Sequence, residues 1–287
     1  MRAAVAMVVS VEAAMTPETL FSLHGKTALV TGGATGIGRM AAHGLMAAGA
    51  RVLIASRKGE MCEATAAELN ALGLSGRAEG FAGDVGSEDG VTAVTKCVKE
   101  RTDALNILMN NAGTTWGKPL GEFPYSAWDK VMSVNVAGLF HLTQTLLPLL
   151  RAGATPDDPA RVVNVGSVMG EVPMGDGAYS YAASKAAVHH LTQILAKELS
   201  GDSITVNALA PGPFVSNMTA FATADPDRRE KVGQGVPLDR VGAPEDIAGC
   251  MQFLCGAGGA YVTGAIIPVS GGINVMTGPS LFERAFI

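Results

Sequence analysis

The sequence predicts an α/β protein with a single doubly wound domain, in which helices cover both faces of a seven-stranded parallel sheet. Short apolar runs alternate with longer helical segments along nearly the whole chain, and this alternation is typical of βαβ units. The candidate strands lack a polar face, as expected when helices cover both sides of a sheet. A glycine-rich turn joins the first strand to the first helix, which is typical of Rossmann-type nucleotide-binding folds.

Each strand is expected from one short apolar run. The runs lie at residues 26–31, 51–56, 78–82, 105–109, 160–165, 204–208 and 264–269. Helices are expected from the glycine-rich turn to residue 48, and at residues 60–72, 88–100, 126–150, 179–199 and 243–255. Because helices of this length between strands produce right-handed crossovers, the strands should be parallel.

The composition favours a globular enzyme over several other classes. Of the 287 residues, 48% are hydrophobic and 16% are charged, a balance that supports a large core and argues against disorder. The net charge is −5 and no block of Lys or Arg stands out, so we expect no nucleic-acid partner. No run reaches the ~18 apolar residues of a membrane span, which predicts no membrane partner.

The cysteines, the histidines and the N-terminal segment bear on redox state, metal binding and location. The four cysteines form no CxxC pair and the five histidines lack metal-site spacing, so we expect reduced thiols, no metal and a cytoplasmic location. Residues 1–22 are predicted to be an N-terminal extension, with a targeting role for their short apolar stretch as the alternative. Residues 23–287 should form the single domain.

The segment TGGATGIG, residues 31–38, is the first candidate for chemistry. Where a strand ends and a helix begins, backbone N–H groups and the positive helix end can face a pyrophosphate. A glycine-rich turn alone could be an ordinary tight turn, and it is the strand–turn–helix context that favours a nucleotide. The candidate contacts are Gly32, Thr35, Gly36, Ile37 and Gly38.

The end of the second strand indicates which nicotinamide cofactor to expect. NAD-binding folds usually place a carboxylate there, bonded to the ribose hydroxyls, whereas this chain has Ser56, Arg57 and Lys58. A serine hydroxyl and a guanidinium can bind a 2′-phosphate. We therefore expect NADP(H), although Arg57 and Lys58 could also be ordinary surface charges.

Tyr181 and Lys185 form the most specific candidate for catalysis. Positions four apart share one face of a helix, so both side chains should enter the same cleft. A neighbouring ammonium favours the phenolate, which predicts that Lys185 lowers the pKa of Tyr181 towards the working range. Ser167 follows the fifth strand, and the carboxyl ends of such strands line the ligand crevice. It can therefore hydrogen-bond a substrate carbonyl.

Together, T-G-x-x-x-G-x-G at residues 31–38, N-N-A-G at residues 110–113 and Y-x-x-x-K at residues 181–185 resemble the short-chain dehydrogenase/reductase family. The resemblance covers roughly residues 23–275 and includes members that reduce 3-oxoacyl carrier proteins or other carbonyl compounds. It implies a catalytic set of Asn135, Ser167, Tyr181 and Lys185, in which Asn135 holds a water that links Lys185 to solvent. It also implies cofactor contacts from Asp84, Val85, Asn111, Ala112, Gly113, Tyr181, Lys185, Pro211, Gly212, Phe214 and Ser216. Asn110 is expected to stabilise the sheet instead.

The same resemblance implies a ketoreductase. The expected reaction reduces a 3-oxoacyl or apolar ketone to a secondary alcohol, with Tyr181 as the general acid. A lid is expected at about residues 213–239. Candidate pocket residues are Trp116, Met169, Val172, Pro173, Met174, Phe214, Met218 and Phe221. The resemblance also implies a small carbonyl compound or an acyl thioester as the substrate, and we expect a homotetramer or a homodimer.

Two departures and two alternatives accompany this interpretation. Ser167 and Tyr181 lie one residue further apart than is common in the family, and the extra residue falls in residues 171–178. Ser216 stands where the family usually has Thr. The alternatives are an NAD-dependent alcohol or polyol dehydrogenase, and a catalytically silent binding or scaffold protein. The filled catalytic set argues against the second.

Overall fold

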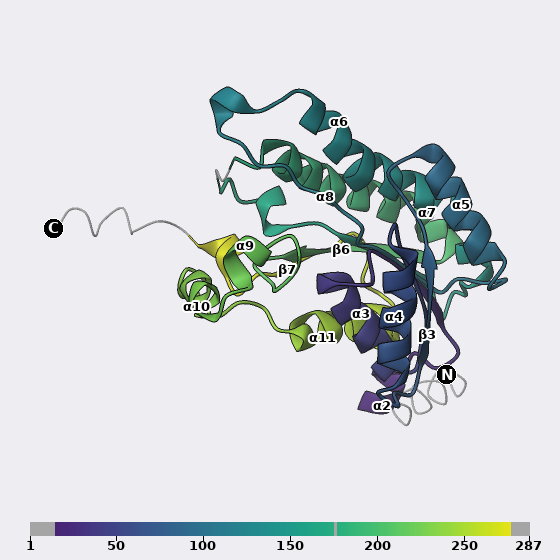
Figure 1. Cartoon of the computed structure of the whole chain (residues 1–287). Helices are drawn as coiled ribbons and strands as arrows, with labels where there is room; N and C mark the ends of the chain where they lie inside the picture. Colours follow the sequence, from purple (N-terminus) through teal and green to yellow (C-terminus); the bar gives the residue numbers. More distant parts are fainter. Residues whose placement is uncertain (1–14, 175–176, 277–287) are drawn as a thin grey trace, which may run out of the picture.

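The sheet of this protein has seven strands in the order β3-β2-β1-β4-β5-β6-β7, and every neighbouring pair is parallel (Figure 1). The computed structural model describes residues 15–174 and 177–276. The predicted fold class is confirmed. The strands are β1 Thr27–Thr31, β2 Arg51–Ser56, β3 Arg77–Ala82, β4 Ile107–Asn110, β5 Ala160–Val165, β6 Ile204–Pro211 and β7 Ile266–Val269.

Helices pack on both faces of the sheet. Those that bear on the fold and the site are α2 Pro17–Phe21, α3 Gly36–Ala47, α4 Gly59–Asn70, α5 Glu88–Lys99, α6 Ser126–Met132, α7 Leu139–Ala152, α8 Tyr179–Leu199, α9 Ala220–Thr223, α10 Pro226–Gln234 and α11 Pro244–Cys255. Along β1, Ala28 and Val30 face the core formed with α3, α4 and α11, and Leu29 faces the core formed with α5, α7 and α8. Side chains of a strand alternate between faces, and both faces are buried here. This explains why β1 and its neighbours are largely apolar, whereas the edge strand β3 carries Arg77 and Glu79.

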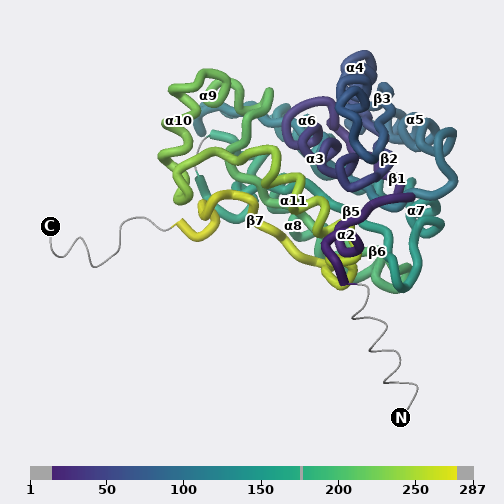
Figure 2. The backbone as a smooth tube through the Cα atoms, turned by 90° about the horizontal axis from the view of Figure 1, so that it is seen from below, coloured from purple at the N-terminus to yellow at the C-terminus, as the bar shows by residue number. Residues whose placement is uncertain are grey.

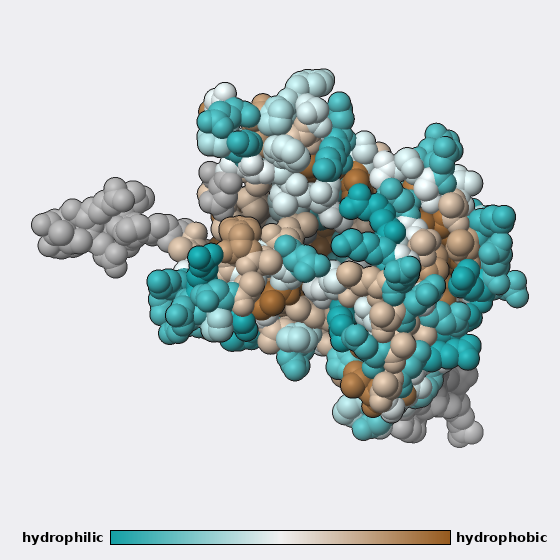
Figure 3. Space-filling view, viewed as in Figure 1, coloured by the Kyte–Doolittle hydropathy of each residue, from teal (hydrophilic) through white to brown (hydrophobic). Residues whose placement is uncertain are grey.

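Both polar and apolar side chains are exposed outside these cores. Figure 3 shows hydrophilic side chains over α10 and along α5, with apolar residues exposed in separate areas between them. Among the described residues, none of the helices combines the length and apolar character needed to cross a membrane.

The predicted helix over residues 126–150 is not one uninterrupted α-helix. A π-helical segment, Ser133–Gly138, separates α6 from α7. Gly138 lies against the loop after β3, since a Cβ there would be 1.9 Å from the carbonyl oxygen of Val85. The chain also directs Asn135 inwards at this point. Single-turn π segments of this kind are frequent at functional sites.

Part of the expected N-terminal extension belongs to the domain. Helix α2 contacts α11 (Figure 2), and Thr16 caps its first turn through the backbone N–H of Thr19. The contact is close, because a Cβ on Gly256 would lie 2.4 Å from the carbonyl oxygen of Leu20. Residues 1–14 lie outside the described residues.

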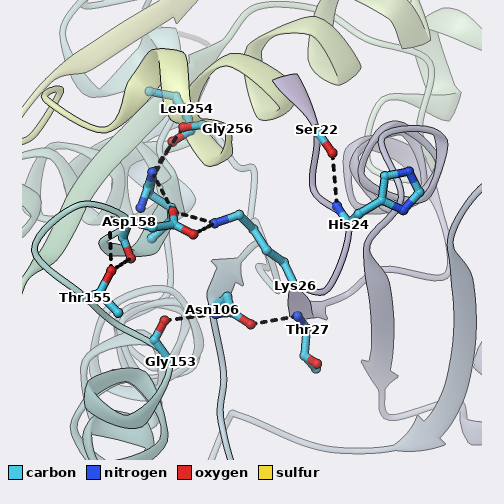
Figure 4. Close-up of polar contacts among 11 residues, drawn as sticks. Ser22, His24, Lys26, Thr27, Asn106, Gly153, Thr155, Asp158, Leu254 and Gly256 are labelled. Atoms are coloured by element: carbon cyan, nitrogen blue, oxygen red, sulfur yellow. Dashed lines mark hydrogen bonds and ion pairs between the residues drawn. The ribbon is translucent and has the colours of Figure 1, made fainter. Parts of the chain in front are cut away.

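A buried arginine joins β5 to the end of α11. Arg161 is 1% exposed; its Nε donates to the carbonyl of Leu254 at 3.1 Å and its Nη2 to that of Gly256 at 3.1 Å. Asp158 accepts from both Arg161 and the ammonium of Lys26, so three segments meet here (Figure 4). A cation at a helix C-terminus also favours the helix dipole.

We expect Arg161→Met to lower the free energy of unfolding by about 3 kcal/mol, because two buried carbonyls lose their donors. Urea unfolding measures the change. The control is Arg151→Ala at the exposed Arg151–Asp202 pair, which should change the same quantity by less than about 1 kcal/mol. Equal effects of the two substitutions would contradict the importance of the buried contacts.

Candidate active site

A cleft runs along the carboxyl ends of the central strands. It consists of two adjoining cavities that share Gly32, Ala112 and Gly113 in their walls. The first cavity is lined by the phosphate loop, the ends of β4, β5 and β6, and Tyr181 and Lys185 of α8. The second lies between the ends of β1, β2, β3 and β4. The strand order reverses between β1 and β4. The cleft therefore lies at the carboxyl ends of these strands, which is where open α/β sheets bind ligands.

The glycines of the phosphate loop leave no room for side chains. Gly32 and Gly36 have positive φ angles of 65° and 51°. A Cβ on Gly36 would lie 2.8 Å from Cβ of Ser216, and one on Gly38 would lie 2.5 Å from Nδ2 of Asn111. Gly32, Thr35, Gly36 and Ile37 line the cleft. Gly38 does not line it, and instead lets Asn111 approach the loop.

The amide of Asn111 holds the loop in place. Its Nδ2 donates to the carbonyls of Thr31 at 2.9 Å and Gly32 at 3.1 Å. The hydroxyl of Thr31 accepts from the backbone N–H groups of Asn111 and Ala112, both at 3.1 Å. As expected, Asn110 stabilises the sheet, because it is buried and donates to Asn164 at 2.9 Å.

The second cavity is lined by Ser56, Arg57, Asp84 and Val85, together with the ends of β1 and β4. Arg57 is exposed and has no ion pair among residues 15–174 and 177–276. Its guanidinium is therefore available to a phosphate. Lys58 is not among the lining residues and forms the N-cap position of α4 instead.

Ser167, Tyr181 and Lys185 meet in the first cavity. The Nζ of Lys185 donates to the carbonyl of Val165 at 2.6 Å and lies 5.5 Å from the centroid of the Tyr181 ring. The hydroxyl oxygen of Ser167 accepts the N–H of Met169 at 3.2 Å, which leaves its proton available for donation. The predicted shared face of α8 thus brings phenol, ammonium and serine together.

Asn135 lies behind this group, 1% exposed. Its Oδ1 accepts the N–H of Thr114 at 2.8 Å, and its Nδ2 donates to the carbonyl of Thr114 and the hydroxyl of Ser184, both at 2.9 Å. These bonds occupy the amide N–H groups. Asn135 therefore joins the π-helical segment to the strand ends and to α8.

Burial dominates the protonation of the two central groups. It raises the pKa of Tyr181, against a hydrogen bond with Ser167 that lowers it, and it lowers the pKa of Lys185 to about 8. The predicted lowering of the Tyr181 pKa towards the working range is therefore wrong, because burial raises this pKa instead. The phenol stays protonated at neutral pH, which suits a proton donor.

The segment after β6 forms the remaining wall. Pro211, Gly212, Phe214 and Ser216 line the cleft as predicted. The ring of Phe214 is 2% exposed and lies against Gly242, so Phe214 offers the cleft its backbone. The predicted lid, residues 213–239, contains the two short helices α9 and α10.

Few of the predicted apolar pocket residues reach the cleft. Phe214 and Met218 line it, whereas Phe221 is 79% exposed, and Met169 and Val172 pack against a small core around Val168. The extra residue of the Ser167–Tyr181 spacing was expected within residues 171–178, of which residues 175–176 lie outside the described residues.

Several lining residues were missed by sequence reasoning. They are Thr31, Ala55, Gly83, Thr114, Lys130, Val134, Val165, Gly166, Asn217 and Thr219. One signal was present: the spacing of Ser216 and Thr219, whose hydroxyls lie 3.0 Å apart, is that of a local serine–threonine turn. No three His, Cys, Asp or Glu side chains in the described ranges are placed to hold a metal ion.

A doubly wound sheet whose glycine-rich loop, serine and Tyr–Lys pair share one cleft defines the class of short-chain dehydrogenases. The family model described as short chain dehydrogenase matches residues 26–227. The chain therefore belongs to this family of oxidoreductases.

Individual relatives agree with this assignment. A Pseudomonas aeruginosa protein named rhamnolipids biosynthesis 3-oxoacyl-[acyl-carrier-protein] reductase is 47% identical over 255 residues, covering 89% of this chain and 98% of that protein. Gluconate 5-dehydrogenase of Gluconobacter oxydans is 33% identical over 261 residues, covering 91% and 99%. A solved structure described as the Pseudomonas aeruginosa RhlG/NADP active-site complex has 47% identity and a TM-score of 0.85, covering 91% of this chain and 100% of its own.

We expect Lys185→Met to raise the free energy of unfolding at pH 7 by about 2 kcal/mol. Burial lowers the pKa of Lys185 from 10.5 to about 8, which corresponds to about 3 kcal/mol of destabilisation that the variant avoids. The variant also loses the hydrogen bond to Val165, which contributes about 1 kcal/mol. Below pH 8 both states bind the proton and the burial cost is complete. Between pH 8 and 10.5 only the unfolded state binds it, so the wild type recovers stability. Urea unfolding at pH 7 and pH 10 measures the difference, and a gain that stays constant with pH would contradict this origin.

Proposed function

We propose that this protein uses NADP(H) to reduce a ketone, either a 3-oxoacyl thioester or another apolar carbonyl compound, to a secondary alcohol. The observation that carries the proposal is the meeting of Ser167, Tyr181 and Lys185 in one cleft with the phosphate loop. A protonated phenol beside a buried ammonium is suited to giving a proton to an oxygen that gains negative charge.

The lining of the cleft is suited to a nicotinamide cofactor along its whole length. Positive φ angles and missing side chains at Gly32 and Gly36 leave the loop free to approach a pyrophosphate. Arg57 and Ser56 in the second cavity are suited to a 2′-phosphate. When bound, NADPH supplies the hydride that adds to the carbonyl carbon.

The protein's own groups handle the proton. Tyr181 donates its hydroxyl proton to the oxygen as the alkoxide develops, and Ser167 donates a hydrogen bond to the same oxygen. Lys185 stabilises the phenolate that remains, since an ammonium with a pKa of about 8 is mostly protonated at pH 7. Asn135 acts through position, by fixing the π-helical segment beside α8, and is proposed to hold the water through which Lys185 exchanges protons with solvent.

The substrate class follows from the walls of the first cavity. Among the described residues that line it, Lys185 is the only cation, and its bond to Val165 directs it away from a substrate carboxylate. An uncharged carbonyl end therefore suits the cavity better than an acid. The similar Pseudomonas aeruginosa reductase is named for a 3-oxoacyl substrate, which supports testing thioesters first.

A polyol dehydrogenase is the second candidate. Relatives named gluconate 5-dehydrogenase match nearly the whole chain, and one solved at 29% identity is described in complex with NADP and tartrate. The absence of a cationic clamp in the first cavity, within the described residues, argues against such acids. The expected homotetramer or homodimer stays a prediction.

We expect the purified protein to consume NADPH with 3-oxoacyl thioesters, 1,2-diketones or aryl ketones, and Tyr181→Phe to lower kcat at least about 1,000-fold while it still binds NADPH. The lost proton donor acts only in the transition state. Loss of absorbance by the reduced nicotinamide measures turnover, and cofactor fluorescence measures binding. Turnover of gluconate-type acids alone would favour the second candidate, and binding without any turnover would favour a scaffold.

We expect Arg57→Ala to raise KM for NADPH about tenfold or more and to leave KM for NADH nearly unchanged, because the proposed partner of the guanidinium is the 2′-phosphate, which NADH lacks. Lys58→Ala is the matched control, since Lys58 does not line the cleft, and should change KM for NADPH less than about twofold. If Arg57→Ala weakens both cofactors equally, the 2′-phosphate assignment is wrong.

A further inference from the structure

A histidine lies beneath the turn that carries Ser167. His189 follows Lys185 by one helical turn on α8 and is 7% exposed. Its Nε2 accepts the backbone N–H of Ser167 at 3.4 Å, and the carbonyl of Ser167 accepts the N–H of Gly170 at 2.9 Å. Both backbone groups of Ser167 are therefore satisfied, one of them by His189.

The turn is shaped to fit the imidazole ring. A Cβ on Gly166 would lie 2.1 Å from Nε2 of His189, and a Cβ on Gly170 would lie 2.8 Å from its Cε1. The glycines on either side of Ser167 thus permit the ring to reach the backbone. Neither glycine has a positive φ angle. The close approach of His189 accounts for Gly166, and at Gly170 the α8 backbone is as near as the ring, with the carbonyl carbon of Lys185 at 2.9 Å from a Cβ.

The contacts of the ring fix its tautomer. An imidazole nitrogen that accepts a hydrogen bond carries no proton, so Nε2 is bare and Nδ1 holds the proton. Nδ1 lies 3.5 Å from Oε1 of Glu171 and makes no hydrogen bond within the described residues. A carboxylate at this distance still favours a proton on Nδ1.

We propose that neutral His189 is a positioning residue for the proposed reduction, which holds the Ser167 turn so that the serine hydroxyl faces Tyr181 and the substrate carbonyl. The inference rests on the proposed function for its effect on rate, and on geometry alone for the hydrogen bond. It adds a third member to the face of α8 that carries Tyr181 and Lys185.

Protonation would break this arrangement, because both nitrogens of an imidazolium are donors. The charged groups that face the ring are Glu171, which follows β5, and Lys185 on α8; β6 and residues 168–170 bring none. Burial and Lys185 lower the pKa of His189 below its ordinary value of 6.5, while Glu171 opposes them. The positioning bond is therefore kept at neutral pH and lost under acid conditions.

The test combines substitutions at positions 189 and 167. His189→Phe keeps a ring and removes the acceptor, whereas His189→Gln places an amide oxygen where it can accept the Ser167 N–H. We expect His189→Phe to lower kcat about tenfold, and His189→Gln to retain at least about a third of it. Both should bind NADPH as the wild type does, and His189→Gln should lack the acid limb of the kcat–pH profile that His189 gives the wild type.

A double-mutant cycle separates positioning from general destabilisation. In a Ser167→Ala background His189→Phe should change kcat less than about twofold, because the hydroxyl it positions is gone. An equal fall in both backgrounds, or a His189→Gln enzyme as slow as His189→Phe, would overturn the proposal.

The hydrogen bond itself is tested without turnover. The ¹⁵N shifts of the His189 side chain at pH 7 should show a protonated Nδ1 and a bare Nε2, and the reverse tautomer would overturn the inference. If no ketone is reduced while this tautomer is found, the proposed function fails and the contact between His189 and Ser167 stands.

Discussion

The amide of Asn111 ties the carboxyl ends of β1 and β4 together, and the rest of the cleft is built on that tie. Its two hydrogen bonds reach the carbonyls of Thr31 and Gly32, at the point where the order of strands reverses along the sheet. Gly32 and Gly38 lack side chains at the places where a Cβ would meet this amide. The glycines of this loop therefore have two roles. They permit the contact between β1 and β4, which are far apart in sequence but paired in the sheet, and they leave the loop open to a phosphate.

The buried face of α8 shows what this site demands of the fold. Tyr181, Lys185 and His189 occupy successive turns, and burial opposes the charged form of each. Apolar residues there would stabilise the helix more. Apolar packing comes from its far end, where Leu195 and Leu199 enter the core formed with α5, α7 and α8. The first turns of α8 thus carry the polar groups of the site, and its last turns carry the apolar packing.

Sequence patterns predicted most of the fold, because apolar periodicity and turn residues report local structure directly. The predicted strands and helices lie within a few residues of their expected positions, although α2, α9 and α10 were not predicted, and the predicted catalytic serine, tyrosine and lysine share one cleft. The π-helical segment was missed since it depends on Gly138 meeting Val85, which no local pattern contains. The sequence could not show which of Arg57 and Lys58 faces the cofactor, because this depends on the structure, in which Arg57 lines the cavity and Lys58 does not. Predicting that the pKa of Tyr181 is raised requires knowing how deeply the side chain is buried, and the spacing of residues in the sequence does not reveal this.

The contacts of Arg161 have a consequence for the chain as it leaves the ribosome. The carbonyl of Gly256 that its guanidinium binds lies 95 residues later in the chain. At synthesis rates of about 5–20 residues per second, those residues take about 5–20 s to appear. During that interval most of the sheet has been made, yet α11 is missing from one of its faces and Arg161 has no carbonyl to bind. Until α11 emerges, the nascent protein therefore has an incomplete core, in which Asp158 is the partner of Arg161 that has already been synthesised.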